Sequence, residues 1–101
     1  MIKMLAVDMD GTCLNHRNHI SAKNMAALRQ LAQSGILIVL ASGRTICCLP
    51  HQLRAEPSLF RYAITSNGAR IDDSAGHCLL CQEIFPDTAL SLLNDCAGLP
   101  V

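Results

Sequence analysis

The stretch Met4-Leu5-Ala6-Val7-Asp8-Met9-Asp10-Gly11-Thr12 decides the fold of this 101-residue chain. Its apolar start predicts a strand over roughly residues 2 to 8, which ends in two carboxylates. Ligands of open α/β sheets bind at the carboxyl ends of strands, where the loops leave the sheet. Side chains two residues apart on an extended segment point the same way, so we expect Asp8 and Asp10 to converge on one metal ion and one substrate atom. Gly11 allows the sharp turn that follows.

Two later apolar runs also end in short polar motifs. The run 36–40 precedes Ala41-Ser42-Gly43-Arg44, and the run 62–65 precedes Ser66-Asn67-Gly68-Ala69. The runs 4–7 and 36–40 are each continuously apolar, which predicts strands that are buried on both faces. The third run predicts another strand of the same sheet.

A helix is predicted between the first two strands. Ser21 is its expected N-cap, Gly35 is its expected end, and apolar residues recur between them at helical spacing. A strand, helix and strand of this length imply a right-handed crossover and a parallel sheet with the helix on one face. The polar loop 15–19 before the helix is expected to cover the site.

The chain beyond Arg44 is less regular. Pro50 lacks a backbone donor, which predicts a short or broken helix there. Segments 70–72 and 79–83 flank Asp73-Ser74-Ala75-Gly76, a pattern typical of a hairpin. Pro86 and Asp87 then open a last predicted helix.

These motifs resemble those of the haloacid dehalogenase superfamily. Asp8-Met9-Asp10-Gly11-Thr12 is similar to its first motif and Ser42-Gly43-Arg44 to its second, while Asn67-Gly68-Ala69 occurs in this order in its Cof-like phosphatase subfamily. The resemblance implies an α/β fold with a Rossmann-like parallel sheet and flanking helices. It also implies a phosphatase of small phosphorylated metabolites, such as sugar phosphates.

The resemblance assigns roles to individual residues. It makes Asp8 the nucleophile that forms an aspartyl phosphate and Asp10 the acid and base. The implied cofactor is Mg²⁺, bound by Asp8 and the backbone carbonyl of Asp10. The phosphate and substrate would be bound by Thr12, Ser42, Gly43, Arg44 and Asn67. For Arg44 a local ion pair, and for Asn67 a simple turn, remain equally open interpretations.

The resemblance covers only the first part of the family's plan. The later lysine and the acidic Gly-Asp motif have no counterpart here. Residues 1–76 resemble the start of the core domain, and residues 77–101 resemble the start of an α/β cap. We therefore expect a truncated form with negligible activity on its own. A nonhydrolytic phosphate-binding or regulatory module is the alternative.

Composition narrows the other possibilities. Hydrophobic residues make up 50% of the chain and aromatic residues 3%, so the expected core is aliphatic. Eight basic and eight acidic residues cancel without a basic cluster, which argues against nucleic acid as a partner. The sequence has no signal peptide and no apolar stretch near the ~20 residues of a membrane span, so we expect a cytoplasmic protein. The family resemblance implies that the other neighbour of the first strand is the strand of the acidic motif, which has no counterpart here, so we expect self-association through that edge.

Six cysteines raise the alternative of a zinc or thiol protein. Cys78 and Cys81 have the spacing of half a zinc site, and Cys47 with Cys48 would have to supply the rest. Adjacent cysteines suit one tetrahedral ion poorly, and residues three apart on a strand point to opposite faces. We therefore interpret the cysteines as reduced thiols, with Cys13 filling an aliphatic position.

Overall fold

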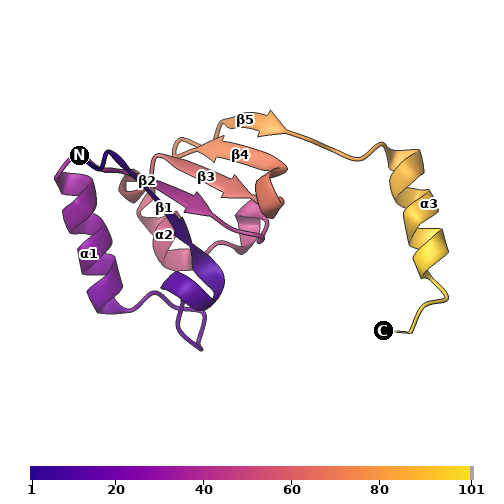
Figure 1. Ribbon diagram of the computed structural model, residues 1–101, viewed down its shortest axis with the longest axis horizontal. Helices are drawn as coiled ribbons and strands as arrows, with labels where there is room; N and C mark the ends of the chain where they lie inside the picture. Colours follow the sequence, from indigo (N-terminus) through magenta and orange to yellow (C-terminus); the bar gives the residue numbers. More distant parts are fainter. Residues whose placement is uncertain (101) are drawn as a thin grey trace.

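A computed structural model describes residues 1–100, and Val101, the last residue of the predicted cap segment, lies outside the described residues. The chain forms a five-stranded sheet in which the strands lie in the order in which they occur in the sequence (Figure 1). The strands are β1 (Met4–Asp8), β2 (Leu37–Ala41), β3 (Tyr62–Thr65), β4 (Arg70–Asp73) and β5 (Cys78–Cys81).

The sheet is mixed. Strands β1, β2 and β3 are parallel, as predicted, whereas β4 and β5 run antiparallel to their neighbours. The antiparallel pair is the predicted hairpin, and its turn is held by Asp73, whose Oδ1 accepts hydrogen bonds from the backbone N–H groups of Ala75 and His77, both at 2.9 Å. The predicted α/β fold is confirmed.

Helix α1 (Ala22–Gln33) connects β1 to β2. Ser21 is its N-cap, and the Oγ atom of Ser21 accepts a hydrogen bond from the backbone N–H of Asn24 at 3.1 Å. Gly35 follows the helix with a φ of +88°, a conformation that only glycine adopts without strain. Both predicted ends of this helix are confirmed.

The segment around Pro50 is broken, as predicted. A single 3₁₀ turn, Ile46–Cys48, ends before Pro50, and helix α2 (His51–Ala55) starts after it. Proline fits in front of a helix because its missing N–H would be unpaired there in any case. A further 3₁₀ turn, Pro57–Leu59, leads into β3.

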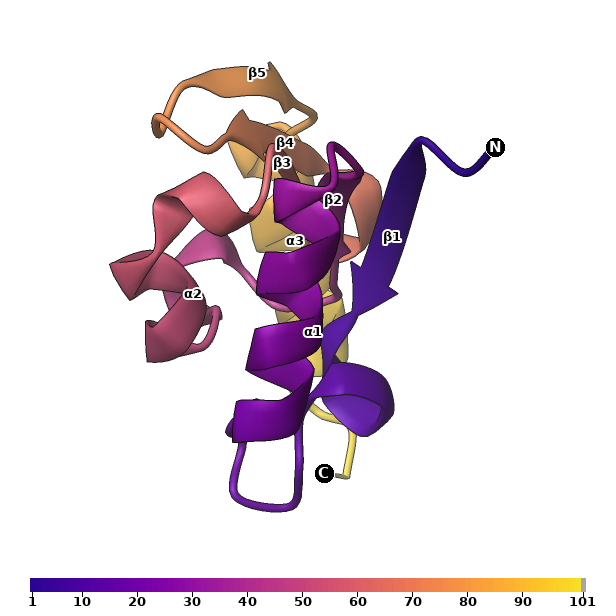
Figure 2. The same cartoon turned by 90° about the vertical axis from the view of Figure 1, so that its left-hand side faces the viewer.

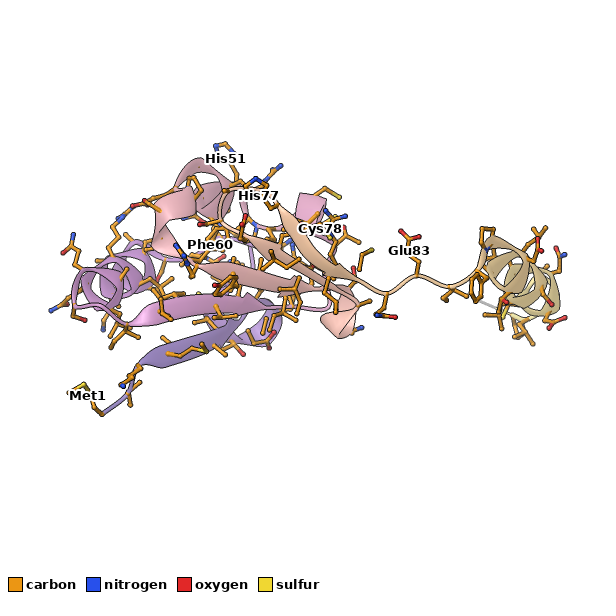
Figure 3. The ribbon with its side chains drawn as sticks, turned by 90° about the horizontal axis from the view of Figure 1, so that it is seen from above. Met1, His51, Phe60, His77, Cys78 and Glu83 are labelled. Carbon is orange, nitrogen blue, oxygen red and sulfur yellow. The ribbon has the colours of Figure 1, made fainter. Side chains whose placement is uncertain are left out.

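Helices α1 and α2 pack on the same face of the sheet (Figure 2). Figure 3 shows the sheet from above, with His51 at the start of α2 on the helix-covered side. The core between helices and sheet is built mainly from aliphatic side chains, as the composition predicted. Its most deeply buried apolar members are Met9, Ile38, Leu40, Leu53 and Ala63.

The prediction that β1 is buried on both faces is wrong. Leu5 and Val7 are half-buried toward the helices, but Met4 is 54% exposed and Ala6 is also exposed. Within residues 1–100 no element covers the other face, and β1 is an edge strand with β2 as its one neighbour. Strand β2 fits the prediction better, because Ile38 to Leu40 are all buried.

Helix α3 (Pro86–Cys96) begins where the sequence predicted, but it lies away from the sheet. An extended segment through Glu83 leads to α3 (Figures 1 and 3), and none of the residues of α3 is buried. Strand β5 precedes this segment and still pairs with β4, so the division at residues 76 and 77 stays a prediction. No helix in the described part of the chain is long and apolar enough to cross a membrane.

Candidate active site

The turn after β1 presents the carboxylate of Asp8. Its Oδ1 atom accepts a hydrogen bond from the backbone N–H of Met9 at 2.9 Å, and its Oδ2 atom accepts one from the Thr12 hydroxyl at 3.3 Å. Gly11 has a φ of +74°, which allows the tight return of the chain. Met9 is fully buried and Cys13 nearly so, and these two side chains anchor the turn in the core. Asp8 itself stays exposed to solvent.

Asp10 is held by Arg44 from the end of the next strand. The two guanidinium nitrogens Nη2 and Nε lie 2.6 and 2.8 Å from the two carboxylate oxygens. These hydrogen bonds lower the pKa of Asp10 and, with the charge of Arg44, outweigh the opposing effect of partial desolvation. Asp10 is therefore ionised at neutral pH. The sequence left open whether Arg44 forms an ion pair with a residue close to it in the chain. Its partner is instead Asp10, which follows β1.

Two further contacts fix Arg44 in place. Its Nη1 atom donates to the backbone carbonyl of Cys48 at 3.1 Å, and its Nη2 atom donates to Oδ1 of Asn18 at 3.1 Å. Asn18 belongs to the polar loop after β1, and the side chain of Gln52 on α2 binds both backbone groups of Ile20 at the end of that loop. Asn18 and Gln52 were missed from the sequence, since amides in a loop and on a short helix gave no signal.

Ser42 lies at the end of β2 and is 7% exposed. Its Oγ atom accepts a hydrogen bond from the backbone N–H of Arg44 at 3.0 Å, which leaves the hydroxyl proton available. Both backbone groups of Ser42 are hydrogen-bonded to the neighbouring chain. The N–H of Ser42 donates to the carbonyl of Ile64 in β3 at 2.9 Å, and the carbonyl of Ser42 accepts from the N–H of Asn67 in the turn after β3 at 3.3 Å. The position of the hydroxyl is thus fixed by the sheet.

The turn after β3 packs closely against Gly43. Ser66, Asn67 and Gly68 all have positive φ, of 50°, 54° and 92°. A Cβ atom on Gly43 would lie 2.9 Å from Oδ1 of Asn67, so a larger residue at position 43 would displace the amide. Asn67 is therefore both a turn residue and a side chain directed at the loop that holds Ser42.

These strand ends surround one cavity of about 330 Å³. It brings together four of the predicted site residues, Asp8, Ser42, Gly43 and Asn67. Arg44 and Asp10 form their ion pair outside its lining. Thr12 lines a neighbouring apolar hollow between β1 and α1 but still bonds to Asp8.

The donor set at this site fits Mg²⁺ in kind. Asp8 is an exposed carboxylate, and hard oxygen ligands are those that Mg²⁺ prefers. The Asp10 carboxylate is occupied by Arg44, so a metal ion would use its backbone carbonyl instead. Within residues 1–100 no three His, Cys, Asp or Glu residues gather to hold a metal, so the protein ligands here would be these two.

A family model for haloacid dehalogenase-like hydrolases matches residues 5–100. The chain belongs to this family. A 5-amino-6-(5-phospho-D-ribitylamino)uracil phosphatase of Bacillus subtilis (strain 168) is 40% identical over 73 residues, which are 72% of this chain and 29% of that protein. An HMP-PP phosphatase of Klebsiella pneumoniae (strain 342) is 34% identical over 94 residues, which are 93% of this chain and 34% of that protein.

Solved structures of the family share the fold. A haloacid dehalogenase-like hydrolase from B. subtilis superposes with a TM-score of 0.79 at 31% identity, over 96% of this chain and 34% of the other. The chain thus spans about a third of the length of these relatives. The predicted family membership, in the form of an amino-terminal portion, is confirmed.

Proposed function

We propose that this chain carries the nucleophilic half of a Mg²⁺-dependent phosphatase that acts on small phosphorylated metabolites. The observation that carries the proposal is the cavity in which Asp8 faces Ser42, Gly43 and Asn67 at the ends of three parallel strands. The two phosphatase relatives support the same reaction class. Their names include a phosphorylated ribityl compound and HMP-PP, so we propose a substrate class of phosphorylated sugars and similar small metabolites.

In this proposal Asp8 is the nucleophile. An Asp8 carboxylate oxygen attacks phosphorus and forms an acyl phosphate while the substrate's alkoxide leaves, and water then hydrolyses the acyl phosphate. The hydrogen bonds from Met9 and Thr12 orient the carboxylate without burying it. Mg²⁺ bound at Asp8 and the Asp10 carbonyl would supply positive charge between two anions.

Asp10 is the proposed acid and base. It would give a proton to the leaving alkoxide and then take one from the attacking water. Its ion pair with Arg44 opposes this role, because a carboxyl group with a lowered pKa holds its proton weakly. We propose that the substrate phosphate attracts Arg44 away from Asp10, which raises the pKa of Asp10 when a proton is needed.

Ser42 and its neighbours are the proposed phosphate ligands. The Ser42 hydroxyl has its proton free for a phosphoryl oxygen, and the Asn67 amide lies beside Gly43 at the same cavity. Donors fixed before the substrate arrives stabilise the charge of the transition state without reorganisation. Thr12 would orient the Asp8 carboxylate by its hydrogen bond and so act on the phosphoryl group indirectly.

The test is hydrolysis of two phosphate esters by the product of the complete reading frame in excess Mg²⁺. Asp10→Asn should reduce hydrolysis of a sugar phosphate, which has a poor leaving group, far more than hydrolysis of p-nitrophenyl phosphate. Equal losses on both substrates would contradict the acid role. No hydrolysis of any phosphate ester by the wild type would contradict the proposed reaction itself.

A nonhydrolytic phosphate-binding module is the second candidate. The Arg44–Asp10 ion pair favours it, because it leaves the proposed acid ionised and occupied. A phosphate-binding module would bind inorganic phosphate at Ser42 and show no turnover. Titration of phosphate into wild type and Ser42→Ala, followed by NMR, tests this binding, and the absence of ester hydrolysis separates this candidate from a phosphatase.

We also propose that the free edge of β1 mediates self-association. Strand β1 pairs with β2 on one side, and Met4 and Ala6 are exposed. Unpaired strand edges attract other strands, so a second copy is the expected occupant. Sedimentation velocity should show concentration-dependent association of wild type that Ala6→Lys weakens. A monomer at all concentrations would contradict the proposal.

A further inference from the structure

Cys47 and Cys48 form a pair of adjacent exposed thiols beside the candidate active site. They lie in the 3₁₀ turn Ile46–Cys48, between the Ser42 loop and helix α2. Their Sγ atoms are 3.9 Å apart. Neither thiol has a place in the proposed phosphatase reaction, so the pair calls for its own explanation.

A disulfide between these two residues would be strained. Adjacent Cα atoms are about 3.8 Å apart across a trans peptide, whereas disulfides usually join Cα atoms about 4.4–6.8 Å apart. Two thiolates bound at about 2.3 Å to one atom that holds its ligands at nearly a right angle lie about 3.3 Å apart, whereas a direct S–S bond is about 2.0 Å long. The observed separation of 3.9 Å is therefore closer to that of two sulfurs bridged by one atom than to that of two bonded sulfurs.

The surroundings limit what that atom can be. A structural zinc ion needs four ligands. In residues 1–100 no three His, Cys, Asp or Glu side chains lie close enough together to hold one metal ion. A thiophilic centre that brings its own organic substituent needs only the two sulfurs. Trivalent arsenicals have this chemistry.

The environment of Cys47 also favours its reactive thiolate form. The Thr45 hydroxyl lies 3.2 Å from the Cys47 sulfur. Hydrogen bonds from Thr45 and Cys48 lower the pKa of the Cys47 thiol and so increase its thiolate fraction. In contrast, burial raises the pKa of Cys13.

We propose that Cys47 and Cys48 are a vicinal dithiol site that binds a trivalent arsenical across both sulfurs. With phenylarsine oxide, two S–As bonds form and the oxygen leaves as water with the two thiol protons. Arsenic stays trivalent, so no oxidant or reductant is required.

The site is connected to Asp10 through one residue. Arg44 donates to the carbonyl of Cys48 and also holds the Asp10 carboxylate. A ring closed over both sulfurs draws them closer than 3.9 Å, which changes the conformation of Cys48 and so weakens the hydrogen bond from Arg44 to its carbonyl. Loss of phosphatase activity on arsenical binding follows, and this part rests on the proposed function, whereas binding itself does not.

The test is retention of phenylarsine oxide by the purified 101-residue chain, measured by intact-mass spectrometry. One adduct should survive an excess of monothiol and be released by a dithiol, because the ring with two S–As bonds resists single thiols. Cys47→Ser and Cys48→Ser should each lose the retained adduct. Adduct retained in either variant, or no retained adduct in wild type, would overturn the proposal.

The second cysteine pair of the chain is the matched control. Cys78 and Cys81 are also exposed. Contrary to the expectation from their spacing, a bulge in β5 places them opposite Asp72 and Arg70 on one face of the sheet, with their Cα atoms about 7 Å apart instead of adjacent in the chain. The Cys78→Ser/Cys81→Ser double variant should retain the adduct as wild type does, and loss there would assign the site to β5. Far-UV circular dichroism of each variant checks that the fold is kept.

Thr45→Val gives a second readout. Without the hydroxyl, the rate of adduct formation should drop several-fold near neutral pH and its pH profile should move to higher pH, while the final adduct is unchanged. An unaltered profile would remove Thr45 from the site. If arsenical binds Cys47 and Cys48 but no ester hydrolysis exists to inhibit, the dithiol site stands and the proposed function fails.

Discussion

Helices α1 and α3 are of similar length, 12 and 11 residues, but they differ in what they contact. Helix α1 buries Met25 and Leu28 against the sheet, whereas α3 has no buried residue. Both carry leucines at helical spacing. The comparison teaches that periodicity determines that a segment is helical, but a partner face determines where the helix packs.

The largest expected effect separates the strand-end carboxylates from those of α3. Asp8→Asn should lower phosphatase turnover by several orders of magnitude with the fold intact, because the amide has nearly the same shape but is a poor nucleophile. Asp95→Asn on α3 is the matched control and should leave turnover unchanged. The measurement is steady-state hydrolysis of p-nitrophenyl phosphate by the product of the complete reading frame. Equal effects at the two positions would break the comparison.

The second effect concerns stability. Leu40 is fully buried, and Leu40→Ala should lower the free energy of unfolding by about 2–5 kcal/mol through lost contacts and a cavity. Leu93 on α3 is 69% exposed, and Leu93→Ala should change it by less than about 0.5 kcal/mol. Urea denaturation of the 101-residue chain measures both. A large loss at Leu93 would mean that α3 packs on a surface after all.

The third effect concerns the helix ends. Ser21→Ala removes the side-chain cap of α1 and should cost about 1 kcal/mol in the same urea experiment. Helix α3 has Phe85 at its N-cap, which makes no side-chain hydrogen bond there. Phe85→Ser should therefore increase helical content by circular dichroism. If neither variant has an effect, capping does not distinguish the two helices.

The smallest expected effect is on the pKa of Asp73, in the β4–β5 hairpin between the parallel strands and α3. The backbone N–H of His77 is the main cause that lowers the pKa of Asp73 below its ordinary value of 3.8, with a smaller contribution from the His77 ring. A carboxyl with a lowered pKa in the folded state stabilises the fold above the unfolded-state value, and this contribution is lost as the pH falls through the folded-state pKa.

NMR titration of the Asp73 carboxyl carbon checks this order of causes. His77→Ala keeps the backbone N–H, so the pKa of Asp73 should stay below 3.8. His77→Pro removes that donor and should bring the pKa back toward the ordinary value. A full return in the alanine variant would make the ring, rather than the backbone, the main partner.

Local signals were enough to predict most of the secondary structure. Ser21 and Gly35 marked the ends of α1, Pro50 marked the break before α2, and the Asp73-Ser74-Ala75-Gly76 turn marked the hairpin. Each of these signals acts within a few residues, through a cap, a missing donor or a turn. The sequence alone therefore carries them.

Long-range features were harder to predict. The exposed face of β1 could not be seen in its apolar pattern, because exposure depends on what the rest of the chain covers. The carboxylate of Asp10 was expected to point with Asp8 toward one metal ion, but it bonds to Arg44, 34 residues away in sequence. The strand-end motifs did predict that Asp8, Ser42 and Asn67 share one cavity, because parallel strands end on the same side.

The strand order of the sheet has a consequence for how the chain assembles. Because β1 to β5 lie side by side in the order of synthesis, each of the strands β2 to β5 pairs with the one made just before it. Among the five strands of residues 1–100, none is inserted between two that were made earlier, and the two hairpin pairings, such as Ile64 with Ile71 and Ile71 with Leu80, close short loops. The sheet can therefore grow from its amino-terminal edge while the ribosome is still extending the chain, one strand at a time.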